Sequence, residues 1–145
     1  MAHYRQESLL RARERIEAEL AQFQRDLLLN DTRLPRKLLE AVRYIQDHLF
    51  DPELNVNTLK LKCQLRNNNV STLFRSIIGL GIREYIESLR LEAADQLLRN
   101  CGFEIYLIAM SVGYEHQETF FRAFQRRFGC TPSHRRSTFR CSDGS

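Results

Sequence analysis

The chain has 145 residues, enough for one domain and one additional element. Apolar residues make up 43% and charged residues 28%, a globular balance that argues against a disordered protein. The sequence holds no run of about 20 apolar residues, as a membrane span requires, and its N-terminus is charged rather than apolar. We therefore expect a cytoplasmic protein with no membrane partner and no secretory signal.

The basic charge of the chain is concentrated toward its C-terminus. The net charge is +4. Residues 1–33 hold six arginines and six acidic residues, which cancel. Residues 115–140 hold six arginines against Glu115 and Glu118, so this segment alone carries an excess of +4. Arginine gathered at one end of a domain indicates a polyanionic partner.

The sequence shows no pattern typical of a catalytic or metal site. The four cysteines are scattered, form no CxxC pair and have no histidine at zinc-finger spacing: Cys63, Cys101, Cys130 and Cys141. We predict reduced thiols, with a disulfide framework or a metal site as the alternatives. The sequence also lacks a glycine-rich phosphate loop and a pairing of nucleophile with base. We expect no enzymatic activity, no cofactor and no metal.

The first segment, residues 5–29, is predicted to form one amphipathic helix. Its seam positions alternate in steps of four and three, as in a coiled coil: Leu9, Arg13, Ile16, Leu20, Phe23 and Leu27. Such a helix either pairs with another chain, giving a homodimer through residues 5–29, or packs on its own domain. We divide the chain into this N-terminal helix (1–33), serving dimerisation or signalling, a folded domain (34–138) and a tail (139–145).

The folded domain is predicted to consist of short helices separated by turns. Pro35 suits the first turn of a helix, and Asn57 or Thr58 is expected to cap a short helix that runs through Cys63. Further helices are predicted over about 67–78, 82–99, 104–111 and 116–128, and a last one opens at Thr131-Pro132. In the 67–78 helix the residues expected to face inward are Val70, Leu73, Phe74 and Ile77. No strand is predicted, so the fold class is all-α.

Residues 104–128 have the spacing of a helix-turn-helix. Ala109 and Gly113 stand four apart, at the point where two helices joined by a three-residue turn approach each other closely. Only a small side chain fits such a contact, and glycine adopts the left-handed conformation of the turn without steric cost. Phe120 and Phe124 are expected to anchor the second helix in the core.

The outer face of that second helix is rich in side chains that recognise bases. With the two phenylalanines inward, the opposite face presents Gln117, Glu118, Phe121, Arg122 and Gln125. Glutamine and arginine make bidentate contacts with adenine and guanine in the major groove. Phosphate contacts, which add affinity without sequence information, are expected from Arg126, Arg127, Arg135 and Arg136.

Residues 57–78 have a second, weaker helix-turn-helix outline. Its outer face offers Asn67, Asn68, Ser71, Thr72 and Arg75. A helix of about 18 residues joins the two units and spans about 27 Å, while successive major-groove faces on one side of B-DNA lie about 34 Å apart. One chain is therefore predicted to read two adjacent major grooves of double-stranded DNA, mainly through the second unit.

Taken together, these motifs resemble a known family. The stretches that carry the resemblance are Gly79–Ile86, Leu89–Ala94, Ile105–Tyr114, Phe120–Phe124 and Phe128–Ser133. Through them, residues from about 35 to 137 resemble the DNA-binding domain of AraC/XylS-type bacterial transcription regulators. The resemblance implies two helix-turn-helix units joined by a rigid linker helix. It also implies binding at promoter DNA as an activator or repressor, often in contact with RNA polymerase.

The resemblance also assigns roles to single residues. Base contacts in this family come from the second helix of each unit, which corresponds here to Gln117, Glu118, Thr119 and Arg122 in one unit and Asn68, Ser71 and Thr72 in the other. The sequence departs from the family at Lys60, where a small residue is usual, and at Thr72, where arginine is frequent. The first unit is therefore expected to contribute less specificity. Its basic residues are expected mostly on phosphates: Lys60, Lys62, Arg66 and Arg75.

Two questions stay open at the level of sequence. Residues 1–33 are too few for the sensor domain that many family members carry. The chain is thus either a small regulator without a sensor or the output end of a longer protein. The altered first unit also leaves an alternative function, a helical protein–protein interaction module that modulates another regulator.

Overall fold

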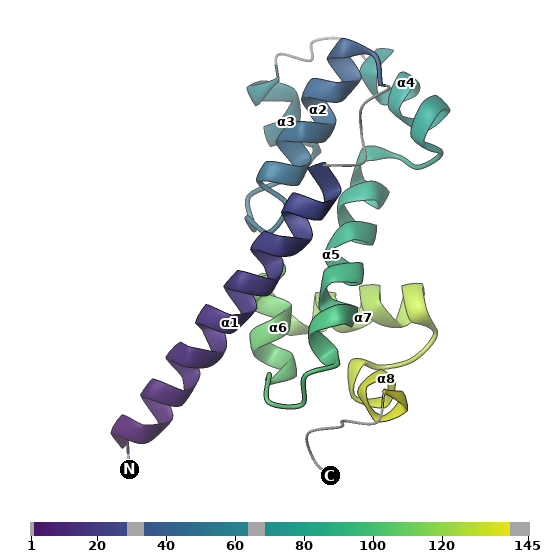
Figure 1. Ribbon diagram of the computed structural model, residues 1–145. Helices are drawn as coiled ribbons and strands as arrows, with labels where there is room; N and C mark the ends of the chain where they lie inside the picture. Colours follow the sequence, from purple (N-terminus) through teal and green to yellow (C-terminus); the bar gives the residue numbers. More distant parts are fainter. Residues whose placement is uncertain (1, 29–33, 64–68, 140–145) are drawn as a thin grey trace.

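The computed structural model describes residues 2–28, 34–63 and 69–139, and all regular secondary structure in these ranges is α-helical. The helices are α1 (Ala2–Leu28), α2 (Arg36–Asp47), α3 (Val56–Lys62), α4 (Asn69–Ile78), α5 (Ile82–Leu98), α6 (Ile105–Ser111), α7 (Gln117–Phe128) and α8 (Pro132–Thr138) (Figure 1). The predicted all-α class is confirmed. None of the described helices is long and apolar enough to cross a membrane.

Capping residues explain where two of the short helices begin. The Asn55 side chain accepts a hydrogen bond from the Thr58 backbone N–H, and the Thr58 hydroxyl accepts one from the Asn55 N–H, both at 2.9 Å. This capping box satisfies two donors of the first turn of α3. The prediction of a cap at Asn57 or Thr58 is therefore wrong. At α8 the predicted start is confirmed, because Thr131 caps the His134 N–H and Pro132 occupies the first turn.

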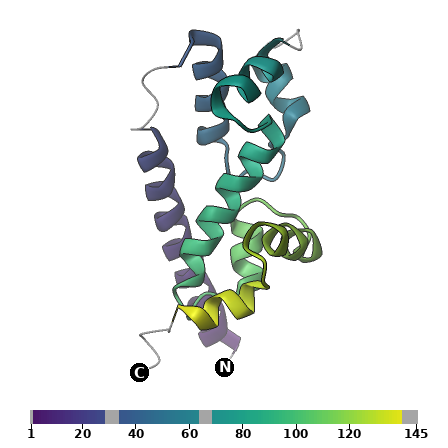
Figure 2. The same cartoon turned by 90° about the vertical axis from the view of Figure 1, so that its right-hand side faces the viewer.

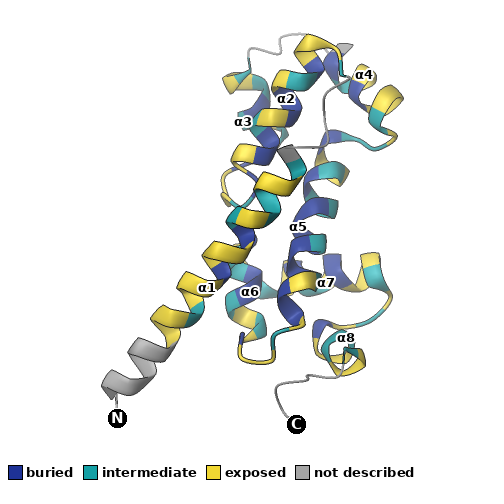
Figure 3. Ribbon diagram, in the orientation of Figure 1, coloured by how far each residue is buried: buried dark blue, intermediate teal, exposed yellow. Residues whose placement is uncertain are grey.

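Two hydrophobic clusters divide the domain into two units. The first unit comprises α2, α3, α4 and the N-terminal half of α5, and buries Leu59 and Phe74 completely. The second unit comprises the C-terminal half of α5 with α6 and α7, and buries Phe120 and Phe124 completely. Because α5 contributes to both clusters, its buried positions extend along its whole length (Figure 3). α5 therefore connects the two units as the predicted linker helix does.

The N-terminal helix packs on its own domain. α1 contacts α2, α5 and α6, and Ile16 and Leu20 are buried in the second unit. Phe23 packs against both clusters, and the Gln24 side-chain amide donates to the backbone oxygens of Gln46 (2.9 Å) and Asp47 (3.3 Å). Most of the predicted seam is thus used within the chain. A homodimer through residues 5–29 would have to compete with this packing, and it stays a prediction.

The N-terminal end of α1 remains outside this packing. It extends beyond α6 (Figure 1), and Leu9 and Leu10 are 45% and 58% exposed. Intramolecular packing requires apolar residues only where α1 lies against the body of the domain. The seam therefore divides into a buried part that begins near Ala12 and an exposed end that precedes it.

Two further expectations are wrong in part. Val70 and Phe74 of α4 are buried as predicted, but Leu73 is 36% and Ile77 45% exposed, because residues four apart form the stripe that faces the core. Cys63 and Cys130 are free, whereas Cys101 is disulfide-bonded, contrary to the prediction of reduced thiols throughout. Among the described residues, no group of three histidine, cysteine or acidic side chains is placed to hold a metal ion.

Candidate nucleic-acid interface

The turn between α6 and α7 has the predicted geometry. Gly113 has a φ of +107°, a conformation that other residues rarely adopt. The Tyr114 backbone N–H donates to the Ala109 oxygen at 3.1 Å, and Ala109 is completely buried. The small residue and the glycine therefore occupy the close contact and the turn that their spacing predicts. Both positions of the helix-turn-helix signature are confirmed.

A buried arginine joins this turn to the first unit. Arg90 of α5 is 9% exposed, and its guanidinium donates to the backbone oxygens of Leu49 and Asp51, each at 2.7 Å. A Cβ atom placed on Gly113 would lie 2.9 Å from the Arg90 Nε atom. Burial lowers the pKa of Arg90. Arg90 thus holds the α2–α3 connection on one side and lies against the α6–α7 turn on the other.

In the sequence, Arg90 stands out only as a member of the stretch Leu89–Ala94, which carries the family resemblance. A signal was present, because residue 90 falls among the apolar positions of α5, and a charge on an apolar stripe requires buried acceptors. The partners themselves could not be predicted, since Leu49 and Asp51 stand 41 and 39 residues away in the sequence.

Tyr114 lies next to this junction and is also buried. Its ring meets the Phe120 ring edge to face, with 5.4 Å between the centroids. Burial, and to a lesser extent the negative charge of Glu87, raise the pKa of Tyr114 to about 12. Tyr114 therefore supports the turn as a neutral, packed side chain.

The outer face of α7 presents the polar residues predicted to contact bases. Glu118, Thr119 and Arg122 are exposed, and Gln117 is half-buried at the start of the helix. All four line one hollow of about 640 Å³, together with residues of α6 and of the turn. Phe121, also on the predicted outer face, instead packs against the core. The structure therefore brings the predicted base-contacting residues of the second unit onto one surface.

In the first unit the described part of the predicted surface lies on α4. Ser71 is half-buried and Thr72 exposed, and both line a hollow of about 400 Å³ with Arg75 and Ser76. The predicted contacts at Asn68 and Arg66 lie outside the described residues. Lys60, on α3, is half-buried.

The two helices that carry these surfaces lie on one side of α5. α4 and α7 project from the same side of the linker, near its opposite ends (Figures 1 and 2). With 17 residues at 1.5 Å each, α5 is about 26 Å long. Between the units, Asn57, Arg83, Thr119 and Arg126 line a further hollow of about 390 Å³. Arg83, in the first turn of α5, is exposed and lines this hollow together with residues of both units. No pattern in the sequence points to it.

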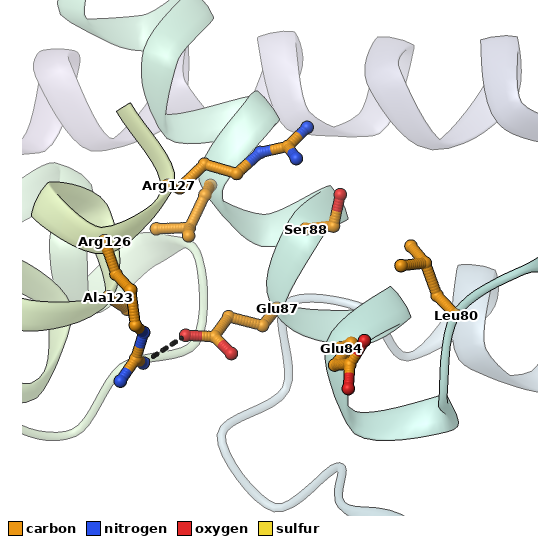
Figure 4. Close-up of a pocket in the computed structure, with 8 residues that line it drawn as sticks. Leu80, Glu84, Glu87, Ser88, Ala123, Arg126 and Arg127 are labelled. Atoms are coloured by element: carbon orange, nitrogen blue, oxygen red, sulfur yellow. Dashed lines mark hydrogen bonds and ion pairs between the residues drawn. The ribbon is translucent and has the colours of Figure 1, made fainter. Parts of the chain in front are cut away.

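Most of the predicted phosphate-binding arginines form ion pairs within the chain. Arg126 and Arg127 of α7 lie 3.0 Å from Glu87 and Glu92 of α5, respectively. Figure 4 shows the first of these pairs across the groove between α5 and α7. Arg135 of α8 donates to both oxygens of Asp95, at 2.8 and 3.2 Å, and this hydrogen bonding raises the Arg135 pKa.

Arg136 has a structural role that sequence reasoning missed. Its guanidinium donates to the backbone oxygens of Leu98, Asn100 and Phe103, at 2.9, 3.2 and 2.6 Å. The Leu98 and Asn100 oxygens lie at the C-terminal end of α5, where carbonyls lack partners within the helix, and the Phe103 oxygen lies in the connection to α6. Burial lowers the Arg136 pKa. A phosphate at Arg136 would compete with these backbone oxygens, and the phosphate contact stays a prediction.

Comparisons with known proteins agree with this geometry. Residues 63–138 match the family described as "Helix-turn-helix domain". The virulence regulon transcriptional activator VirF of Yersinia enterocolitica is 44% identical over 66 residues, 46% of this chain. The regulatory protein SoxS of Salmonella typhimurium is 35% identical over 92 residues, 63% of this chain. The chain spans 24% of the length of VirF and 85% of that of SoxS.

A solved structure shows the same arrangement of helices. The C-terminal domain of AraT, a response regulator from Geobacillus stearothermophilus, aligns with a TM-score of 0.69 and 27% identity, over 74% of this chain and 88% of that one. The chain belongs to the AraC/XylS-type family of helix-turn-helix, DNA-binding transcription regulators.

Proposed function

We propose that this chain binds double-stranded promoter DNA sequence-specifically, with α7 in one major groove and α4 in the adjacent one. The observation that supports this most is the placement of α4 and α7 on one side of α5, each with polar residues on its outer surface (Figure 2). The length of α5, about 26 Å, is close to the roughly 34 Å between successive major-groove faces.

Arg122 and Gln117 are the principal base readers in this proposal. Arg122 is exposed at the centre of the α7 surface, where a guanidinium can make bidentate contact with guanine. Gln117 lies at the N-terminal end of α7, the end that enters the groove first in helix-turn-helix complexes, and its amide suits adenine. Glu118 and Thr119 complete this surface, while Ser71 and Thr72 of α4 contribute weaker readout.

Activation is the proposed outcome at the promoter, with RNA polymerase as a partner. The support is the name of one relative, VirF, a transcriptional activator. The alternative is a protein–protein interaction module, motivated by the altered first unit. Its pairing of residues 5–29 with another regulator would have to compete with the packing of Ile16, Leu20 and Phe23 within the chain.

Selection of bound duplexes from a random DNA library tests the proposal. The intact chain is expected to enrich a site with two boxes, and Arg122→Ala to relax one base position in one box at a loss of about 1–3 kcal/mol. Arg13→Ala, which removes an exposed arginine of α1, is the matched control and is expected to enrich the same site. If the intact chain enriches no sequence, the proposal is wrong.

A further inference from the structure

A row of carboxylates on α5 faces arginines from three other helices. Glu84, Glu87, Glu92 and Asp95 form this carboxylate row, each within ion-pair distance of one arginine. The partners lie on α4, α7 and α8: Arg75 at 3.7 Å, Arg126 and Arg127 at 3.0 Å, and Arg135 at 2.8 Å. Glu84 and Glu87 line the groove shown in Figure 4, together with Arg126 and Arg127.

The paired arginines are those predicted to bind phosphate. Among the described residues, five arginines are predicted to bind phosphate. Four of these five pair with the carboxylate row: Arg75, Arg126, Arg127 and Arg135. The fifth, Arg136, is held by backbone oxygens. Three of the six arginines in residues 115–140, the segment whose charge indicates a polyanionic partner, are thus paired with carboxylates of the linker.

The pairs at Glu87 and Glu92 add little to the stability of the fold. Arg126 and Arg127 are 70% and 43% exposed, while Glu87 and Glu92 are 28% and 46% exposed, so water reaches at least one partner of each pair and screens the interaction. The pair of Arg135 with Asp95 differs, because Asp95 is only 13% exposed and accepts two hydrogen bonds. A structural role therefore explains the last pair better than the first two.

Neutralised arginines weaken the charge-driven part of DNA binding. Binding to arbitrary DNA depends almost entirely on charge, whereas binding to a cognate site gains additional free energy from base contacts. A phosphate at Arg126 or Arg127 competes with Glu87 or Glu92 for the guanidinium, and the carboxylate repels the phosphate as well. The carboxylates at Glu87 and Glu92 therefore lower the sequence-independent part of the affinity for DNA.

We infer that Glu87 and Glu92 are positioning residues, which restrain Arg126 and Arg127 and so weaken the charge-driven, sequence-independent part of DNA binding. This inference rests on the proposed function, since it requires a DNA partner. Neither carboxylate reads a base in this role. Each acts through the arginine that it holds.

The experiment compares the intact chain with the double variant Glu87→Gln and Glu92→Gln on two duplexes. One duplex carries the sequence selected from the library, and the other has the same composition in scrambled order. On the scrambled duplex the variant is expected to bind several-fold tighter, up to about eightfold per arginine at about 0.1 M salt, with a salt slope steeper by about 0.9 per arginine released. The same steepening of the salt slope is expected on the selected duplex, because both duplexes offer the same phosphates.

Two controls separate this effect from a change in net charge. Glu17→Gln with Glu19→Gln removes the same two charges from exposed positions of α1 and is expected to leave the slope unchanged. In an Arg126→Gln background, Glu87→Gln is expected to gain less than it does in the intact chain, because only the repulsion of phosphate by the carboxylate is then relieved. Equal or weaker binding of the double variant to scrambled DNA would overturn the inference, because the pairs would then be inert or structural. Failure of the proposed function is a different result, in which the intact chain binds both duplexes equally.

Discussion

Single residues at the junction of the two units carry much of the geometry. Gly113 combines a φ of +107° with a position against the Arg90 guanidinium, so two separate constraints require glycine there. Gly79 has a similar φ of +88° but nothing within 4 Å of the place that a Cβ would occupy. The two glycines therefore separate the effect of backbone conformation from that of crowding.

Gly113→Ala is expected to destabilise the domain more than Gly79→Ala. Backbone strain at a positive φ costs about 1–3 kcal/mol at either position. Only Gly113→Ala also displaces Arg90 from the carbonyls that it joins. Denaturant unfolding of both variants measures the difference, and equal free energies of unfolding would show that Arg90 adjusts without cost.

The raised pKa of Tyr114 predicts a loss of stability at alkaline pH. The phenol titrates near 10 when unfolded and at about 12 in the folded chain, so the unfolded state loses its proton first. The free energy of unfolding therefore falls as the pH rises from about 10 to 12, by about 3 kcal/mol from this residue. Below pH 10 the phenol is protonated in both states and contributes no pH dependence.

Tyr114→Phe provides the measurement, because other groups titrate in the same range. Unfolding of the intact chain and of the variant is followed from pH 9 to 12. Between pH 10 and 12 the free energy of unfolding of the intact chain is expected to fall by about 3 kcal/mol more than that of the variant, which has no phenol to titrate. Parallel curves would contradict the burial of the Tyr114 phenol.

At the scale of elements, the sequence predicts helices more reliably than it predicts their partners. Helical periodicity and turn residues are local, so α5, α6 and α7 begin and end within one residue or so of the predicted positions. The spacing of Ala109 and Gly113 likewise encodes the turn. The ion pairs of Arg126 and Arg127 join residues 39 and 35 apart, and no local pattern specifies them.

The N-terminal helix shows the same limit. Its period of four and three predicts an apolar seam but does not distinguish packing on another chain from packing on the domain. The tertiary structure answers this for Ile16 and Leu20, which are buried, and for Leu9, which is 45% exposed. The polar residues that helical periodicity places on the outer face of α7 lie together in the structure, whereas no local pattern predicts the structural role of Arg136.

Packing of α1 predicts a difference between its two ends. Ile16→Ala is expected to lower the free energy of unfolding by about 2–5 kcal/mol, because it leaves a cavity in the second unit. Leu9→Ala, on the exposed end, is the matched control and is expected to have an effect within about 0.5 kcal/mol. Equal effects of the two substitutions would contradict the packing of α1 on its own domain.

At the scale of the whole molecule, several contacts fix the two units relative to each other. α5 belongs to both hydrophobic clusters, Arg90 touches both units, and Phe23 of α1 packs against both. The separation and rotation between α4 and α7 are therefore set by the fold before DNA is bound. A rigid pair of reading helices tolerates only one spacing and one helical phase between its two boxes.

Insertion of base pairs between the two boxes of the selected site tests this account most directly. An insertion of about five base pairs, half a helical turn, places the boxes on opposite faces of the duplex. We predict that the affinity then falls to that of a duplex with a single box, and that an insertion of about ten base pairs does not restore it, because α5 cannot lengthen. The affinity could instead stay unchanged after the half-turn insertion while binding still requires both boxes. That result would contradict a rigid protein that reads two adjacent grooves.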